Sequence, residues 1–432
     1  MNKRFLSVLT CLMLLIGLFV PLSASAAAED KATVKVRVVG LPDGKSIEAY
    51  VQVGAESFTN TSGDALKMDK PTALGALIAA LKSTGTAPEI KTVSFGSYVT
   101  KIAGLSEKQL NANTGWSFWV NNQAPQVGAD QAEIQTGDEI VWGYSDWSQT
   151  LYPKVELSTL HPELGKDFTV QVTADKTTFD KDFNATTTTV AVDGAVLYDA
   201  NGVKLAETNQ DGVATVNAAT TGLISFYVDK TDAATGVPLL VRTGLYDVLT
   251  EVDHETYNDL NPFKWSKKPV EILAARGIVV GDGQGSFEPG RAVTRAELAK
   301  MVALTDDNLQ LGGYARFSDL NGHPFQRYIE TAVAKGYMVG DAEGTFRSND
   351  LVTREELAVV LVRLAHAQPS ESVVLPYTDA KQGGKHALPF VKTALDKGIM
   401  SGYADGTFRF HAAATRAEVA TALVNVLWKD LL

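Results

Sequence analysis

The last part of the chain contains an internal repeat, and this repeat constrains the fold more than any other feature. Three segments begin with an aromatic residue followed two positions later by an aspartate, at Tyr257, Phe317 and Tyr377. Each segment continues through an apolar-periodic stretch to a glycine, a second glycine and a phenylalanine at constant spacing. Chance does not place so many matched positions three times, so the same structural unit is expected three times. The matched positions are Gly277, Gly281, Phe287; Gly336, Gly340, Phe346; and Gly398, Gly402, Phe408.

Each repeat predicts a helix, a glycine-rich loop and a second helix. The first helix ends in a cation followed by glycine, as in Arg276-Gly277, which is typical of a helix C-terminus. The repeated phenylalanine is expected to hold the loop onto the core. The second helix opens with threonine and, three residues later, glutamate, the pattern of a capping box. These openings are Thr294–Glu297, Thr353–Glu356 and Thr415–Glu418.

An arginine follows the capping threonine in every repeat, at Arg295, Arg354 and Arg416. Capping explains the threonine and the glutamate without any ligand, but it does not explain the arginine. A cation in the first turn opposes the positive end of the helix dipole, at a cost of roughly 0.3–1 kcal/mol. Its repetition indicates another task for the guanidinium. A helix N-terminus beside an arginine predicts a local anion site.

These motifs together resemble the S-layer homology (SLH) family. The family pattern joins an opening aromatic-x-Asp, a Gly-Ile-x-x-Gly stretch, a Gly-Thr-Phe loop and Thr-Arg-Ala-Glu, and the resemblance covers about residues 257–428. It implies an all-α, pseudo-threefold triplet with grooves between the repeats. It also implies that the grooves bind an anionic secondary cell-wall polysaccharide, often pyruvylated, and that neighbours in an S-layer are further partners.

The resemblance assigns roles to particular residues. Arg295, Arg354 and Arg416 are the implied contacts to the anion. The opening aspartates either support that site or only cap the following turn, and both interpretations stay open at this stage; they are Asp259, Asp319 and Asp379. The family's tryptophan is present once, as Trp265, whereas the equivalent positions are Pro324 and His386. Unequal grooves are therefore expected.

The first 28 residues have the order of a secretory signal peptide. Lys3 and Arg4 precede an apolar run from Phe5 to Val20, and Ala24–Ala26 offers a small-residue cleavage site. A membrane anchor is the alternative, but the run is short for a hydrocarbon core of ~30 Å. Cys11 is the only cysteine and lies in the middle of the run, so lipidation is not expected. The mature chain then has no thiol or disulfide.

Composition excludes several classes of partner. The chain has 432 residues and a formal net charge of −11, which opposes non-specific binding to nucleic acid or to anionic membranes. An anionic polymer must therefore be bound by locally placed cations. The predicted location is outside the cell, at the wall or in an S-layer.

Residues 29–150 predict an α+β domain. Strands are expected over Val34–Val39, Ile47–Val53, Gly115–Asn121 and Asp138–Tyr144, with a helix over Thr72–Lys82. Four of the six tryptophans fall between positions 116 and 147.

Alternation along the strand places Trp116, Phe118 and Val120 on one face and Trp119 on the other. These aromatic residues form either the core of the sheet or a stacking surface for a sugar or another flat ligand, with Trp119 and Trp147 as the exposed candidates.

The stretch Gly115–Asn122, with Thr136–Trp142, resembles a β-grasp-like family similar to the cap domain of cobalamin carriers. The likeness implies a fold and assigns no ligand. Residues 151–250 contain short alternating segments separated by turn signals, starting after a predicted linker at Pro153 and Pro162. They predict an all-β sandwich that resembles immunoglobulin-like surface modules and serves as a spacer.

No catalytic or cofactor motif was found. The sequence has no HExxH and no Gly-x-Ser-x-Gly motif, and its six histidines lack metal-ligand spacing. No cofactor, metal or enzymatic activity is expected, although a pair of distant carboxylates for glycan hydrolysis stays an open alternative. The leading hypothesis is a wall-anchored display protein; a small-ligand receptor is second. The predicted units are 1–28, 29–150, 151–250, 257–310, 317–370 and 377–432.

Overall fold

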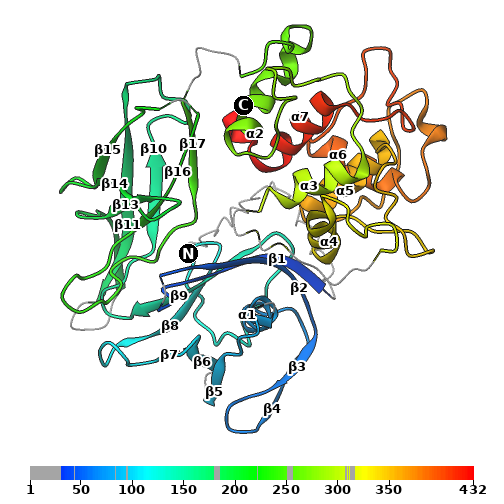
Figure 1. Cartoon of the computed structure of the whole chain (residues 1–432). Coiled ribbons are helices and arrows are strands. Elements are labelled where there is room, and N and C mark those ends of the chain that lie inside the picture. Colours follow the sequence, from blue (N-terminus) through cyan, green and yellow to red (C-terminus); the bar gives the residue numbers. More distant parts are fainter. Residues whose placement is uncertain are drawn as a thin grey trace, which may run out of the picture.

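The computed structural model describes residues 31–432 apart from 43, 83, 94–95, 180–184, 221, 251–255, 307–308, 310 and 312–316. The predicted signal peptide lies outside the described residues. Figure 1 shows three parts: an α/β unit at the bottom, a β unit on the left and a helical unit on the upper right. This arrangement confirms an N-terminal and central region built mostly of β-strands and a helical C-terminal region.

The N-terminal part is a mixed four-stranded sheet with one helix packed on it. The sheet order is β2-β1-β9-β8, in which β1 and β9 are parallel and the other pairs are antiparallel. Alternate residues of β1 are buried against the apolar side of α1, together with Trp142. Its elements are β1 (Lys31–Val39), β2 (Ile47–Gly54), β3 (Glu56–Thr59), β4 (Ala65–Met68), α1 (Ala73–Lys82), β5 (Glu89–Val93), β6 (Gly96–Ile102), β7 (Leu105–Ser106), β8 (Thr114–Val120) and β9 (Glu139–Asp146).

The second face of this sheet is also covered, which corrects one prediction. Trp119 does lie opposite Trp116 and Phe118, but only 8% of it is exposed. It packs with Val141 of β9 and with Val241 and Tyr152 of the central part. The prediction that Trp119 is exposed is wrong, because a neighbouring part of the chain covers its face of the sheet.

The central part consists of two packed four-stranded sheets. One contains β10-β11-β12 with β15 paired to β11, and the other has the order β14-β13-β16-β17. Phe168 and Val170 from the first sheet meet Phe226 and Val228 from the second in one core. The strands are β10 (Pro153–Leu157), β11 (Asp167–Phe179), β12 (Ala185–Ala191), β13 (Val196–Asp199), β14 (Lys204–Glu207), β15 (Val213–Asn217), β16 (Gly222–Asp229) and β17 (Tyr246–Thr250).

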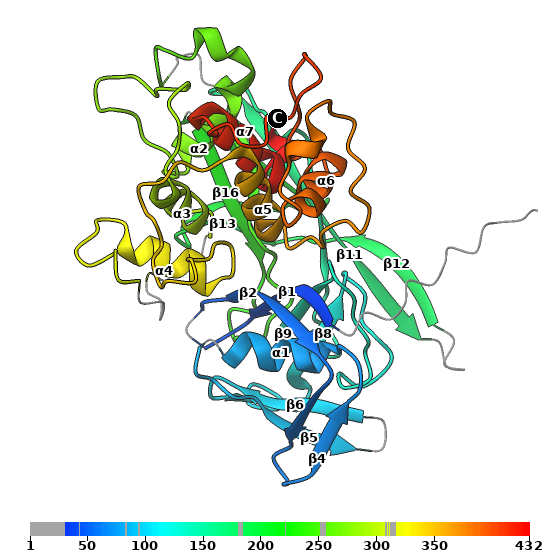
Figure 2. The ribbon, with the colours of Figure 1, turned by 90° about the vertical axis from the view of Figure 1, so that its right-hand side faces the viewer.

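The predicted linker at Pro153 is instead a strand. Pro153 is the first residue of β10, which lies at the edge of its sheet and pairs with β11. Proline is compatible with the first position of an edge strand, where its missing N–H is not needed. Figure 2 shows the outer halves of β11 and β12 projecting from the molecule as a two-stranded arm.

The C-terminal part is a closed ring of three helix pairs. The second helix of each repeat packs against the first helix of the next repeat: α3 against α4, α5 against α6, and α7 against α2. The helices are α2 (Lys267–Ala275), α3 (Arg295–Ala303), α4 (Gln326–Ala334), α5 (Arg354–Leu364), α6 (Leu388–Asp396) and α7 (Arg416–Leu427), with short 3-10 helices η1 (Asn261–Ser266), η2 (Ala380–Gln382) and η3 (Lys429–Leu431).

Backbone hydrogen bonds close the ring at its centre. The residues that precede the three capping threonines bond to one another in a cycle: Val293 N–H to Ala414 O, Ala414 N–H to Val352 O, and Val352 N–H to Val293 O. Phe287, Phe346 and Phe408 are fully buried in one core shared by the repeats. The expected role of the repeated phenylalanine is thereby confirmed.

The three parts contact one another through specific polar and aromatic pairs. Arg37 of β1 donates to the carbonyl of Arg242 at 2.7 Å, which joins the N-terminal and central parts. Arg276, at the end of α2, pairs with Asp247 of β17. Tyr50 of β2 stacks on His366, which follows α5, with ring centroids 3.8 Å apart, and this contact joins the N-terminal and C-terminal parts.

The Tyr50–His366 contact predicts sensitivity to acid. Burial, with a smaller contribution from Lys335, lowers the pKa of His366 to about 4. Between pH ~6.5 and ~4 the unfolded chain therefore takes up a proton that the folded chain does not, and stability falls as the pH falls. We expect this group alone to contribute a loss of about 3 kcal/mol.

Denaturant unfolding at pH 7 and pH 4.5 measures this contribution by comparing the wild type with His366→Asn. Asparagine is a suitable replacement because His366 has a φ of 48°. His386→Asn is the control, since His386 is exposed. Equal pH dependence in the wild type and His366→Asn would contradict the assignment. The other groups around His366 are Tyr337 and, in the adjoining hollow of about 270 Å³, Lys35 and Glu139.

Candidate functional site

The three second helices begin with complete capping boxes, as predicted. In each box the threonine Oγ1 accepts from the backbone N–H of the glutamate, and the glutamate carboxylate accepts from the backbone N–H of the threonine. The first helices end at Gly277, Gly336 and Gly398, all with positive φ. The local signals at both helix ends were therefore sufficient to predict the geometry.

The helix N-termini themselves are closed to ligands. The N–H of Arg295 donates to Asp350 O at 2.9 Å and that of Ala296 donates to Ser348 O at 3.0 Å. Equivalent bonds join α5 and α7 to the next repeat in the ring. The next N–H is taken by the capping threonine, so the predicted use of helix N–H groups as an anion site is wrong. Only the arginine side chains are left for that role.

Each arginine side chain also ties its repeat to the next one. Arg295 donates from Nε to Phe346 O at 2.9 Å and from Nη2 to Val339 O at 2.7 Å. Arg416 makes the same bonds to Phe287 O and Val280 O, at 2.8 and 2.7 Å. Both guanidinium groups lie over the phenylalanine rings of the neighbouring loops.

The third guanidinium nitrogen distinguishes the arginines. Nη1 of Arg295 and Nη1 of Arg416 have no hydrogen-bond or ion-pair partner among the described residues. Neither atom is fully buried. Both atoms therefore reach the surface, although each side chain is about nine-tenths buried. Burial lowers the pKa of each arginine from its ordinary value.

Arg354 differs at this atom. It donates to Phe408 O and Ser401 O like its counterparts, but Nη1 donates to Glu418 at 2.7 Å. The hydroxyl of Tyr403 donates to the same carboxylate oxygen of Glu418. Arg354 is thus fully paired inside the protein.

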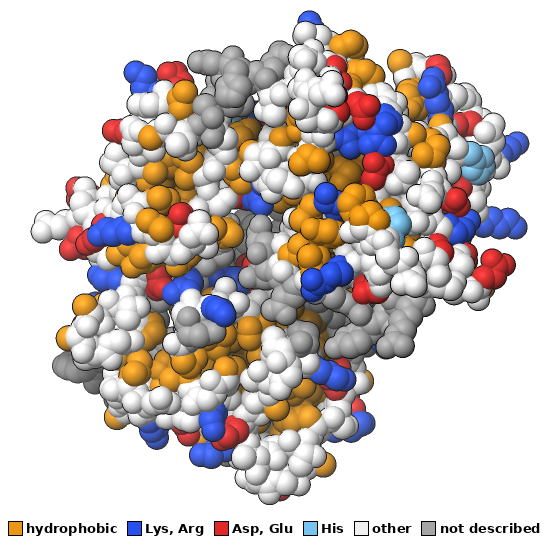
Figure 3. Space-filling view, viewed as in Figure 1, with side chains coloured by type: hydrophobic (Ala, Val, Ile, Leu, Met, Phe, Trp, Pro, Cys, Tyr) orange, Lys and Arg blue, Asp and Glu red, His pale blue; other side chains and the backbone are white. Residues whose placement is uncertain are grey.

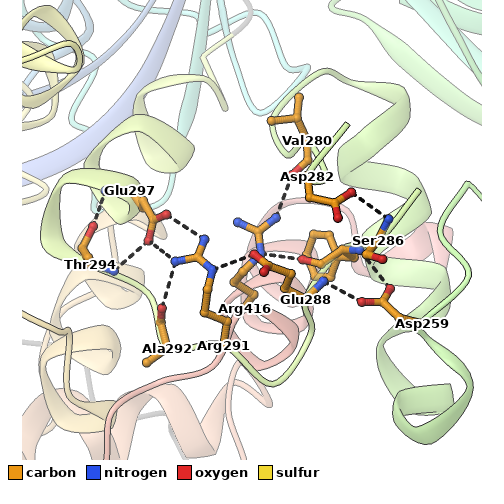
Figure 4. A network of polar contacts seen from close by, with 11 residues as sticks. Asp259, Val280, Asp282, Ser286, Glu288, Arg291, Ala292, Thr294, Glu297 and Arg416 are labelled. Carbon is orange, nitrogen blue, oxygen red and sulfur yellow. Dashed lines mark hydrogen bonds and ion pairs between the residues drawn. The ribbon is translucent and has the colours of Figure 1, made fainter. Parts of the chain in front are cut away.

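Figure 4 shows the junction where Arg416 of the third repeat meets the loop of the first. Arg291 lies beside Arg416 and bonds Glu297 through Nη2 at 2.7 Å and Glu288 through Nε at 3.0 Å. The charge of Arg291 contributes, after burial, to lowering the pKa of Arg416. Two guanidinium groups therefore lie close together at this junction.

The opening aspartates hold the loops in shape. Asp319 accepts from the N–H of Phe346 at 2.9 Å through one oxygen and from the N–H of Arg347 at 2.7 Å through the other. Arg347 has a φ of 56°, and its equivalents Glu288 and Arg409 share this left-handed conformation. Asp259 and Asp379 make the same pair of bonds. Their direct contact with a polymer stays a prediction.

The predicted aromatic contacts lie at the surface. Trp265, in η1, is 54% exposed, and Pro324 and His386 at the equivalent positions are exposed as well. In the N-terminal part, Trp147 is 61% exposed and lies against Gly115, where a Cβ atom would be 3.3 Å from the indole ring.

Neither a metal centre nor a membrane span was found in the described part of the chain. No cluster of three or more histidine, cysteine, aspartate or glutamate side chains there is arranged to hold a metal ion. No helix among the described residues has the length and apolarity needed to cross a bilayer.

Comparison with known families defines the class of this chain. The S-layer homology domain model matches residues 256–299, 316–358 and 376–420. A second model, a domain of unknown function (DUF4430), matches residues 72–146. The chain thus carries three SLH repeats and is a secreted cell-surface protein anchored at the wall or S-layer through them, as the sequence predicted.

Individual relatives share only part of their length with the chain. Amylopullulanase of Thermoanaerobacterium thermosulfurigenes is 31% identical over 49% of this chain and 12% of its own length. The cellulosome-anchoring protein of Acetivibrio thermocellus is 32% identical over 29% of each chain. Haptocorrin in complex with Cbi is similar at 21% identity, covering 29% of this chain and 28% of that chain. The TM-score is 0.21, which is too low to assign a shared fold.

Proposed function

We propose that the SLH triplet holds the protein at the wall by binding an anionic secondary cell-wall polysaccharide, such as a pyruvylated one. The observation that carries this proposal is the surface-reaching Nη1 atom of Arg295 and of Arg416. Neither guanidinium makes an ion pair with a described carboxylate, so each is a largely buried cation without a direct carboxylate partner. The nearby charges of Glu356 and Glu297 act in the direction that raises the pKa of Arg295 and Arg416, respectively, but burial outweighs them. A polymer carboxylate at Nη1 would supply a charge-assisted hydrogen bond to each.

The surrounding surface favours local recognition over a general attraction. On the face shown in Figure 3, Lys and Arg side chains are interspersed with Asp and Glu over all three parts. The net charge of −11 opposes a polyanion at long range. Selective binding must therefore come from a few defined cations. The exposed indole of Trp265 is available beside repeat 1 for packing against a sugar ring.

Sedimentation of the purified chain with cell-wall sacculi tests this function. We expect the protein to bind native sacculi and to stay in solution with sacculi from which the secondary polymer has been extracted by acid. Added free polymer should compete for the bound protein. Equal binding to native and extracted sacculi would assign the anchor to peptidoglycan instead.

In this proposal the N-terminal part is the module displayed at the cell surface and the central part is a spacer. Neither part has a catalytic role. The sheet order and parallel β1–β9 pair of the N-terminal part support a β-grasp-like fold, and the two packed sheets of the central part support an immunoglobulin-like spacer. Release of labelled oligosaccharides from wall glycan by the purified chain would contradict the non-catalytic assignment.

A second candidate function is capture of a flat ligand by the N-terminal part. The exposed Trp147 is the observation that favours it, whereas Trp119 no longer contributes because it is buried. Tetrapyrroles and glycans are titrated into the protein while its tryptophan fluorescence is recorded. A bound ligand should quench the fluorescence of the wild type and leave that of Trp147→Phe unchanged. Lack of quenching by any of them would remove this candidate.

A further inference from the structure

The three equivalent arginines have unequal opportunities to bind an anion. In sequence all three helices open with Thr-Arg, and all three arginines donate to two carbonyls of the next loop. The residues around the third nitrogen differ between the repeats. Tyr403 of the third repeat occupies the position that is Asp282 in the first and Asp341 in the second.

Tyr403 and Glu418 both contact the guanidinium group of Arg354. Glu418 lies 2.7 Å from Arg354 Nη1, and the exposed fractions of the two side chains are 14% and 4%. Arg354 also lies over the rings of Tyr403 and Phe408 at 4.7 Å. Arg409 also contacts Tyr403, with its guanidinium carbon 3.8 Å from the ring centroid.

Glu418 is charged in this arrangement. Burial alone would raise the pKa of Glu418, but hydrogen bonds from Thr415 and Tyr403 and the charge of Arg354 outweigh burial and lower it. The carboxylate therefore neutralises Arg354 at neutral pH. A polymer carboxylate could reach this guanidinium only by displacing a buried ion pair, which is costly.

The corresponding glutamates at the other two junctions make their hydrogen bonds to other groups than the arginines. Beside Arg416, Glu297 is held away by Arg291, which bonds both of its carboxylate oxygens. Beside Arg295, Glu356 bonds the backbone N–H and the hydroxyl of Thr353. It makes no ion pair with Arg295 among the described residues.

We infer that only Arg295 and Arg416 bind the anionic groups of the polymer, whereas Arg354 is a structural tie that Glu418 neutralises. This inference rests on the proposed function and names its binding residues. The triplet then offers two anion sites. The sequence departures at Pro324 and His386 predicted unequal grooves, but the ion pair of Arg354 identifies which arginine is excluded.

Titration of purified secondary polymer into the full chain, followed by calorimetry, tests the inference. Arg295→Gln and Arg416→Gln should each raise the dissociation constant about tenfold. Arg354→Gln should change it less than twofold. It is also the control for the shared carbonyl bonds, because all three substitutions remove equivalent ones. Arg354→Gln additionally breaks the ion pair with Glu418, so unfolding midpoints are measured in parallel to report how far each variant is destabilised.

Glu418→Gln provides a test that does not depend on removing an arginine. Glutamine keeps the capping geometry but removes the charge that neutralises Arg354. We expect this variant to bind polymer at least twofold more tightly, and Glu356→Gln to bind like the wild type. Equal losses for all three arginine variants, or no gain for Glu418→Gln, would overturn the inference. A wild-type chain that fails to bind polymer would instead overturn the proposed function.

Discussion

Replacing Phe346 by alanine is expected to lower the free energy of unfolding of the helical part by about 3–5 kcal/mol. Phe346 is fully buried, its ring packs against Phe317 with centroids 5.6 Å apart, and Arg295 lies over it at 4.7 Å. Alanine removes the ring and leaves a cavity at the junction of repeats 1 and 2. The core is shared by the whole ring, so the loss should destabilise all three repeats.

Guanidinium-induced unfolding, followed by far-UV circular dichroism at the helical signal, measures this effect. Trp265→Ala is the matched control, because it removes a larger aromatic side chain that is 54% exposed. That control should cost less than ~1 kcal/mol. A Phe346→Ala variant as stable as the control would contradict a core role for the repeated phenylalanine.

Gly402→Ala is expected to destabilise the third repeat by about 3 kcal/mol or more. A Cβ atom at this position would overlap the Tyr377 ring, at 2.5 Å from Cζ, and would lie 2.8 Å from Thr407 O. Both neighbours are held by hydrogen bonds, since the Tyr377 hydroxyl accepts from the N–H of Gly402 and Thr407 O accepts from the N–H of Tyr403, each at 2.8 Å. Gly340 faces Phe317 in the same way.

Thermal unfolding of Gly402→Ala and of Gly384→Ala compares a crowded glycine with an open one in the same repeat. The nearest atom to a Cβ at Gly384 is a Glu355 carboxylate oxygen at 3.5 Å, an ordinary contact. We expect a clear drop in the unfolding midpoint for the first variant and little change for the second. Similar midpoints would show that Tyr377 can move aside.

Local sequence signals predicted the local structure of the repeats well. The capping boxes, the C-terminal glycines and the buried phenylalanines depend on residues close in sequence or on simple burial. The pairing of an opening aromatic residue with a second glycine in each repeat also has a direct cause, because Tyr377 and Gly402 are in contact, as are Phe317 and Gly340.

The sequence could not predict what the arginines bond to inside the protein. Their acceptors are carbonyl groups of the next repeat, and a carbonyl is present at every residue, so no side-chain pattern marks the acceptor. The closing contact from Arg416 to Val280 spans 136 positions. For the same reason the pattern did not reveal that the N–H groups of Arg295 and Ala296 are already used.

The errors in the β-rich parts have a similar origin. Alternation correctly assigned Trp119 to one face of its strand, but it carries no information on whether Val241 and Tyr152 cover that face. Pro153 was predicted to lie in a linker, yet an edge strand tolerates proline at its first position. Strand content was therefore predicted better than the contacts between parts.

Calorimetric titration of the intact chain with purified polymer, compared with the same polymer after chemical reduction of its carboxylates, tests the central claim most directly. Reduction keeps the sugar rings but removes the groups proposed to bind Arg295 and Arg416. We predict saturable binding of the native polymer and a loss of affinity of at least tenfold after reduction. Equal affinity for both polymers would contradict anion recognition by these arginines.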